Sequence, residues 1–157
     1  MRKLSEKELT IRAIECSTEL AIPSSEIIIN QSATGDVISG AVLEAAVSWN
    51  DFYLLFLTDD IPQEDTLSIH FLDKELKLLD SATIGAMYST GSFTSLQLIK
   101  PNTLTFRFIG DTDWTIKLFD KPTLTLPFLS DPKCVKRKLA LSNYFKVQGS
   151  PIPESAK

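Results

Sequence analysis

The fold is decided by one stretch in the first half of the chain, LEAAVSWNDFYLLF, residues 43–56. Apolar side chains alternate with smaller or polar ones from Leu43 to Trp49, which is typical of a strand with one buried face. Asn50-Asp51 then predicts a two-residue turn into a second strand. Pairing across this turn sets Trp49 opposite Phe52, Val47 opposite Leu54 and Ala45 opposite Phe56. All of these apolar groups fall on one face, and a one-residue slip would turn them away from it, so the register is well specified.

A second hairpin is predicted a few residues further on. Apolar residues alternate with Ser68 and His70 over 67–71, and Asp73-Lys74 can turn the chain. Pairing across this turn would set Phe71 opposite Leu76 and Ile69 opposite Leu78. His70 lies on the other face of this strand, so we expect it to be exposed or half-exposed.

A third hairpin is predicted over residues 93–99 and 104–109. The turn Lys100–Thr103 carries proline at its second position, where the fixed φ of proline suits a β-turn. Both faces of these strands are partly apolar, a pattern that favours a central strand pair covered on both sides.

The chain then turns again at Gly110–Asp113 into another strand. Its inward residues are Trp114, Ile116 and Leu118, and Lys117 points outward. Leu124 and Leu126 predict a last short strand before Pro127.

The two ends of the chain look different. Ser5 and Glu8 match a capping box, and Leu9, Ala13, Cys16 and Leu20 recur at helical spacing, so a helix over 6–20 is predicted. A strand is the alternative, because Leu9, Ile11 and Ala13 also alternate. Asp131-Pro132 predicts the start of a second helix that keeps its basic residues in water, namely Lys133, Lys136, Arg137 and Lys138.

These patterns predict a mainly β (α+β) fold: an antiparallel meander of hairpins with an N-terminal and a C-terminal helix. A sandwich and a partly open barrel both fit the pattern. The length of 157 residues suits a single domain over 1–148, followed by a loose tail over 149–157.

Composition indicates a soluble, cytoplasmic protein. Cys16 and Cys134 form neither a disulfide framework nor a metal-type spacing. Polar residues follow Met1-Arg2-Lys3 where a signal peptide would be apolar, and the longest apolar run, 52–57, is too short to span a bilayer.

The motifs of common enzymes and cofactor sites are missing. His70 is the only histidine and there is no CxxC, which argues against a zinc site, and no G-x-S-x-G elbow accompanies a possible Ser-His-Asp triad. The six glycines form no phosphate-binding pattern. We therefore expect neither an enzyme nor a cofactor, and no resident metal.

Charge is distributed unevenly along the chain. Residues 36–131 hold 14 acidic and 6 basic residues, a balance of −8, and residues 132–157 hold one acid and six bases, a balance of +5. The first 35 residues contribute −1, which closes the sum to −4. An acidic body repels nucleic acid and attracts basic partners.

Acidic residues cluster in the loops between the predicted hairpins. One loop carries Asp59, Asp60, Glu64 and Asp65, a turn carries Asp111 and Asp113 beside Trp114, and another turn carries Asp51. Such carboxylates could act as paired general acids and bases. They could also bind calcium, although residues 111–113 lack the remaining ligands of an EF-hand loop. A third interpretation is that they are turn residues, or a surface that meets a basic protein.

Two stretches, 48–60 and 110–114, resemble the immunity proteins of bacterial contact-dependent growth inhibition (polymorphic toxin) systems. The likeness lies in size, acidity, β-rich build and aromatic hairpins over 36–131, and not in a shared motif. It implies a cytoplasmic monomer that binds one cognate toxin, often a basic nuclease, and occludes its active site. The residues expected to contact this partner are Asp51, Asp59, Asp60, Glu64, Asp65, Asp111, Asp113 and Trp114.

Two other classes of function remain open from the sequence. One is a small β-barrel or sandwich enzyme or ligand-binding module with a carboxylate-lined cavity, and the other is a structural or assembly protein.

Overall fold

The computed structural model describes residues 1–15, 22–60, 65–86, 90–125, 131–138 and 140–151, and these residues form strands, turns and loops without a helix. Three antiparallel sheets result. The central sheet has the order β1 (Arg2–Lys3), β5 (Val42–Trp49), β6 (Phe52–Thr58), β7 (Leu67–Asp73), β8 (Leu78–Ile84) and β12 (Val135–Lys136). A four-stranded sheet has the order β13 (Ser142–Gln148), β11 (Asp113–Leu124), β10 (Thr103–Arg107) and β9 (Thr94–Ile99). A small sheet has the order β2 (Leu9–Ile14), β3 (Ser24–Ile29) and β4 (Ser32–Ser39).

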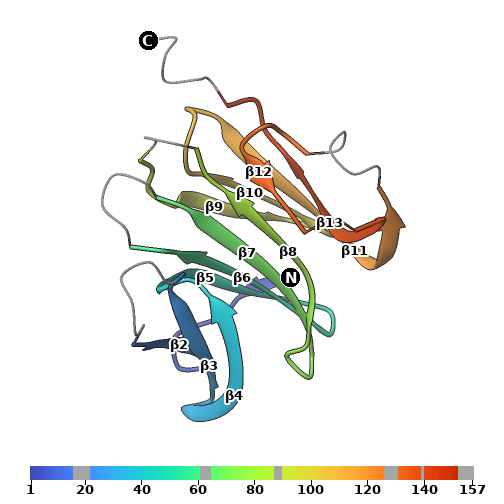
Figure 1. Cartoon of the computed structure of the whole chain (residues 1–157). Helices are drawn as coiled ribbons and strands as arrows, with labels where there is room; N and C mark the ends of the chain where they lie inside the picture. The colour runs from blue at the N-terminus through green and yellow to red at the C-terminus, as the bar shows by residue number, and fades with distance from the viewer. Residues whose placement is uncertain (16–21, 61–64, 87–89, 126–130, 139, 152–157) are drawn as a thin grey trace.

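The central sheet lies between the other two, and each of its faces has a hydrophobic core (Figure 1). Successive residues of β6 serve the two cores in turn: Leu54 and Phe56 face the four-stranded sheet, and Leu55 and Leu57 face the small sheet. This explains why β6 is a continuous apolar run, since a strand covered on both faces has no solvent side. The sheets are open and stacked, so the structure is a layered sandwich and not a closed barrel.

The first predicted hairpin is confirmed residue by residue. Trp49 pairs with Phe52, Val47 with Leu54 and Ala45 with Phe56, and Asn50 takes a left-handed φ of 52° in the turn. The apolar partners all enter the core that faces the four-stranded sheet.

The second hairpin forms, but its predicted register is wrong. Phe71 lies opposite Asp80 and Ile69 opposite Ala82. The loop is longer than a two-residue turn, because the Asp73 carboxylate accepts the N–H groups of Glu75 and Lys77 at 3.0 and 2.9 Å. An irregularity between Phe71 and Leu72 shifts the register further. Leu76 could not have paired with Phe71, because the two side chains belong to cores on opposite faces of the sheet.

The third hairpin is confirmed, with Leu98 opposite Leu104 and Ile99 opposite Thr103. The expectation of a central pair covered on both sides is wrong for its first strand. β9 is the outer strand of its sheet, and the outward side chain of Ile99 is 47% exposed. β11 begins as expected, with Trp114, Ile116 and Leu118 buried and Lys117 exposed. Leu124 ends this same strand, and Leu126 lies outside the described residues.

The predicted N-terminal helix is wrong over its described part, where the alternative strand is found. One of the two capping-box contacts forms, because the Ser5 N–H donates to the Glu8 carboxylate at 3.0 Å. The Glu8 N–H donates to the Ser5 carbonyl, as in a simple turn, and not to the Ser5 hydroxyl. After this single turn, Leu9–Ile14 pairs along its whole length with β3. Cross-strand packing outweighs the local signal, since Leu9 lies opposite Ile29 and Ile11 opposite Ile27.

The predicted C-terminal helix is also wrong. Residues 131–138 form a turn and the two-residue strand β12, which pairs with the end of β8. Lys133, Lys136 and Lys138 are exposed as expected, but Arg137 is buried between two carboxylates. Most of the predicted tail lies outside the described residues. Gly149 lies so close to the Trp114 ring that an added Cβ would stand 2.7 Å from it.

Candidate functional site: an acidic end of the sandwich

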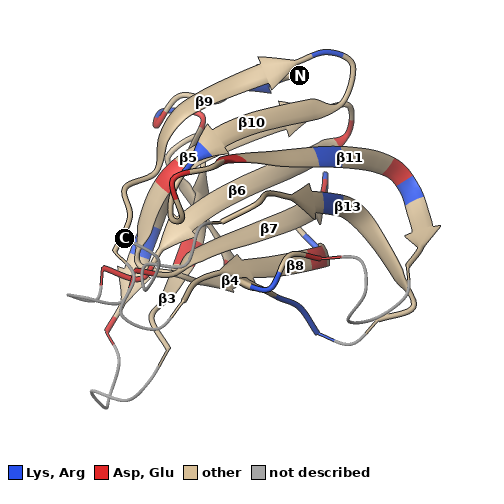
Figure 2. Ribbon diagram, turned by 90° about the horizontal axis from the view of Figure 1, so that it is seen from above, with Lys and Arg blue, Asp and Glu red and all other residues tan. Residues whose placement is uncertain are grey.

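Carboxylates from two sheets gather at the end of the molecule where β6 ends and β11 begins (Figure 2). Asp59 and Asp60 follow β6, and Asp65 precedes β7. Because Thr58 pairs with Leu67 in the antiparallel ladder, the residues just beyond this pair must lie together at one end of strands β6 and β7. We call this region, with Asp111 and Asp113, the acidic end.

Asp59 and Asp65 are close enough for their charges to interact. Burial raises the pKa of the Asp59 carboxyl, and the negative charge of Asp65 raises it further. Asp59 Oδ1 is shielded from solvent and has no hydrogen-bond partner among the described residues. Asp65 differs, because its Oδ2 accepts the Gly91 N–H at 3.3 Å. Asp59 therefore lies where its negative charge is unfavourable, because it is partly buried and close to the charge of Asp65.

The turn between β10 and β11 brings Asp111 and Asp113 to the same end. Gly91, which is bonded to Asp65, packs tightly against this turn: an added Cβ would stand 2.7 Å from Ile109 Cγ2 and 2.8 Å from the Phe108 carbonyl oxygen. Asp111 and Asp113 are exposed, and Asp113 forms a 3.2 Å ion pair with Arg107. Exposed pairs of this kind contribute little to stability, so both partners can rearrange on binding.

The remaining residues predicted to bind a partner lie elsewhere. Asp51 is exposed in the turn between β5 and β6, at the opposite end of the central sheet. Trp114 is fully buried, and its Nε1 donates to the Ile109 carbonyl at 2.9 Å, so it supports the turn from within the core and leaves no surface for a partner. Glu64 lies outside the described residues.

His70 is buried, at 4% exposure, and the expectation that it is exposed is wrong. The predicted strand is confirmed, but the small sheet covers the face that the sequence pattern assigns to solvent. His70 Nε2 lies 2.8 Å from the Ser39 carbonyl oxygen, which can only accept, so Nε2 carries the hydrogen. Burial lowers the pKa of His70.

This geometry does not build a catalytic triad. Ser39 Oγ lies 3.4 Å from Nε2, but that nitrogen is already a donor to the Ser39 carbonyl and cannot take the hydroxyl proton. On the other side of the ring, Nδ1 has no hydrogen-bond partner within the described part of the chain, and so no carboxylate orients it. Over the same residues, no three His, Cys, Asp or Glu side chains converge as metal ligands would.

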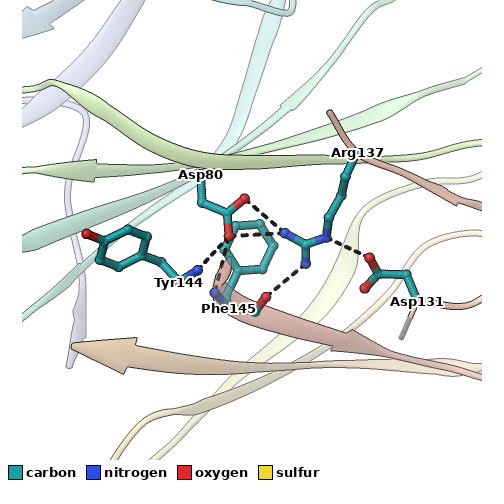
Figure 3. Close-up of polar contacts among 5 residues, drawn as sticks. All are labelled: Asp80, Asp131, Arg137, Tyr144 and Phe145. Atoms are coloured by element: carbon teal, nitrogen blue, oxygen red, sulfur yellow. Dashed lines mark hydrogen bonds and ion pairs between the residues drawn. The ribbon is translucent and has the colours of Figure 1, made fainter. Parts of the chain in front are cut away.

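The sequence reading missed a buried ionic cluster that joins the two larger sheets (Figure 3). Arg137 donates to both oxygens of Asp80 at 3.0 and 3.1 Å, to Asp131 at 2.8 Å and to the Phe145 carbonyl at 2.9 Å. Its guanidinium also lies 4.2 Å from the centre of the Phe145 ring. Burial raises the pKa of Asp80, although Arg137 and three backbone N–H groups oppose this shift.

The cluster occupies the outer edge of β13 as a neighbouring strand would. Asp80 accepts the N–H groups of Tyr144 and Phe145 at 2.8 and 3.3 Å, and Arg137 donates to the Phe145 carbonyl. No sequence signal could have found this arrangement, because Asp80 and Arg137 are 57 positions apart and Arg137 sits in a run of otherwise exposed basic residues.

No family model, curated protein or solved structure matches this chain. No helix in the described residues is long and apolar enough to cross a membrane. The chemistry of the acidic end is therefore the basis for any functional conclusion.

Proposed function

We propose that this chain is a cytoplasmic immunity protein that binds a cognate, basic toxin domain of nuclease type and occludes its active site. The observation that carries the proposal is the acidic end. There, the loops of two sheets bring five carboxylates to the same end of the sandwich: Asp59, Asp60, Asp65, Asp111 and Asp113. Carboxylates in such a group can occupy the positions that phosphates take in a nuclease groove. The sequence resemblance to immunity proteins supports the same conclusion.

The electrostatics of Asp59 favour a cationic partner in particular. Its carboxylate is partly buried beside Asp65, and this arrangement raises its pKa. A lysine or arginine of the partner placed beside the two carboxylates would relieve the repulsion between Asp59 and Asp65. The exposed carboxylates Asp60, Asp111 and Asp113 would steer a basic partner toward this end and speed association.

The test is co-expression with the toxin domain encoded by the adjacent gene, followed by copurification and a growth assay. Asp60→Asn removes one exposed charge at the acidic end, and Asp51→Asn is the matched control because it removes the same charge at the opposite end. We expect Asp60→Asn to slow association several-fold at low salt and Asp51→Asn to leave it unchanged. A toxin that stays lethal without a complex, or equal effects of the two substitutions, would overturn the proposal.

One observation favours a second candidate, a carboxylate-based enzyme. Asp59 and Asp65 interact and have different surroundings, as a general acid and base pair must. Hydrolysis of a glycoside panel by the purified chain, lost in both Asp59→Asn and Asp65→Asn, would favour this candidate over the inhibitor.

A further inference from the structure

His70 is a buried ionisable side chain that belongs to neither the acidic end nor the ionic cluster. It is the only histidine of the chain, and it lies between β7 and the small sheet. Its Nε2 donates to the Ser39 carbonyl of β4 at 2.8 Å, and its Nδ1 has no hydrogen-bond partner within the described residues. A protonated ring would therefore carry a charge and a second N–H at a place that offers no acceptor.

Within the described residues, no carboxylate forms a hydrogen bond or ion pair with His70. Burial lowers the pKa of His70, and the hydrogen bond to the Ser39 carbonyl opposes this shift. The residues opposite His70 in the central sheet are Leu55 and Ser81, and neither is ionisable. The ionisable residues on its own strand and on the strands around it are Asp73 on β7, Tyr53 on β6, Asp80 on β8, Asp36 on β4, Glu26 on β3 and Lys136 on β12.

The carboxylates among these residues have other partners or lie several residues away. Asp80 bonds to Arg137 on the other face of the central sheet, and Glu26 pairs with Arg12. Asp73 accepts the N–H groups of its own loop. Asp36 lies three residues from Ser39 along β4, about 10 Å away. A proton on His70 thus finds no compensating charge while the small sheet is in place.

The small sheet is joined to the central sheet by side-chain packing and few hydrogen bonds. The two sheets share no strand pairing in the described residues. Backbone bonds join them at the connecting segments, where the Leu4 N–H donates to the Ala46 carbonyl and the Ala41 N–H to the Thr58 carbonyl. The buried residues between the sheets are leucine, isoleucine and alanine, and every buried aromatic ring of the described residues belongs to the core on the opposite face (Figure 1). The small sheet can therefore separate without breaking a ladder or uncovering the larger core.

We propose that His70 is a pH-sensitive switch: protonation at Nδ1 places a charge between the small sheet and the central sheet, and the small sheet separates to give that charge access to water. The two larger sheets stay packed on each other, and the apolar face of β6 and β7 becomes uncovered. The inference does not depend on the proposed function.

The sign of the effect follows from the two environments of the ring. In the open state the ring is in water and has an ordinary pKa near 6.5, whereas in the closed state its pKa is lower. The open state therefore binds the proton more tightly, and lowering the pH below about 6.5 favours opening. The ratio of open to closed molecules rises by up to about tenfold per pH unit until the pKa of the closed state is reached.

The test is amide hydrogen exchange of the full chain at pH 7.5 and 5.5, expressed as protection factors so that the intrinsic pH dependence of exchange cancels. A separated small sheet has its apolar face in water and does not keep its ladder, so its amides exchange. We expect protection over β2, β3 and β4 to fall by up to about tenfold at pH 5.5 and protection over β10 and β11 to stay constant. Trp49 and Trp114 both lie in the other core, so their fluorescence should not change.

His70→Gln is the control variant, because glutamine can donate an N–H to the Ser39 carbonyl and does not titrate. The variant keeps Asp59 and Asp80, whose pKa values are also raised, so it separates their titration from that of the histidine. We expect its protection factors to be the same at both pH values. A loss in the variant equal to that in the unchanged chain would overturn the proposal. Equal protection of the unchanged chain at both pH values, or a loss across all three sheets together, would overturn it as well.

A second measurement keeps the test independent of whether the variant folds. Because the chain has a single histidine, the NMR signals of the imidazole report protonation of His70 directly in the unchanged chain. Loss of protection over the small sheet should follow protonation of this ring as the pH is lowered. A small sheet that opens while the ring is still neutral, or that stays protected after the ring is protonated, contradicts the proposal. Either result leaves the proposed inhibitory function intact, because that function rests on the acidic end.

Discussion

Replacing Arg137 with methionine tests whether the buried ionic cluster holds the two larger sheets together. The side chains of Arg137 and Asp80 are only 7% and 10% exposed, so the substitution leaves a carboxylate in the interior without its cation. Four hydrogen bonds and the contact with the Phe145 ring are lost. Breaking a buried pair in this way costs about 3–5 kcal/mol.

This loss is large compared with the total stability of a domain, which is about 5–15 kcal/mol. At roughly 2–4 °C per kcal/mol for a protein of this size, the midpoint of thermal unfolding should fall by about 6–20 °C. Urea unfolding measures the free-energy change directly. Lys138→Met is the control, because Lys138 is exposed one position away and its replacement should change stability by less than about 0.5 kcal/mol.

A double variant separates the charge from the packing. Asp80→Asn combined with Arg137→Met removes the unpaired negative charge, and we expect it to be more stable than Arg137→Met alone. If Arg137→Met instead costs less than about 1 kcal/mol, the pair is exchanging with water and the description of the cluster as a buried clamp is wrong.

Two further substitutions test the small sheet that covers His70. The pKa of His70 is lowered in the folded state, so between that value and the unfolded value near 6.5 the unfolded chain binds more protons. The His70 contribution to stability is therefore fully present above about pH 6.5 and falls as the pH is lowered, by up to about 1.4 kcal/mol per pH unit. Urea unfolding at pH 7.5 and 5.5 should show this loss in the unchanged chain relative to His70→Gln, and parallel pH profiles would contradict it. Gly40→Ala should cost about 3 kcal/mol or more, because φ is 120° and the new Cβ would stand 2.4 Å from Leu57 Cβ. Gly35→Ala has open space and should cost only about 1 kcal/mol in the same assay, so equal losses would refute the packing argument.

The hairpins show how far local pattern carries a prediction. In the first hairpin, alternation and a two-residue turn agree, and every predicted pair is found. In the second, the two strands are confirmed but the predicted register is wrong. The longer loop depends on the Asp73 carboxylate accepting backbone N–H groups, and the register shift beside Leu72 leaves Asp80 opposite Phe71, where it meets Arg137. That partner is remote in sequence, so no window around the turn could reveal it.

The ends of the chain show local signals overridden by tertiary contacts. The Ser5 N–H bonds to the Glu8 carboxylate as in a capping box, yet the following residues form a strand that pairs with β3. Asp131-Pro132 begins a turn as its composition suggests, but Arg137 is drawn between Asp80 and Asp131 and no helix follows. Intrinsic helix signals are worth too little to compete with packing of this kind.

The sequence predicted which acidic residues form the candidate site, but not which of them lie together in space. The sequence indicated the acidic loops, and five of their carboxylates do share one end of the sandwich. It could not separate Asp51, which lies at the other end, or exclude Trp114, which is in the core.

By itself, the sequence determined that this protein is built from antiparallel strands and that acidic residues lie in the turns between them, because side-chain alternation and turn chemistry act over a few residues. Only the tertiary structure decided that a second sheet covers His70, that β9 is an open edge and that Arg137 is buried. Each of these depends on which sheet packs on which face, and that choice is made by contacts between residues far apart in the chain.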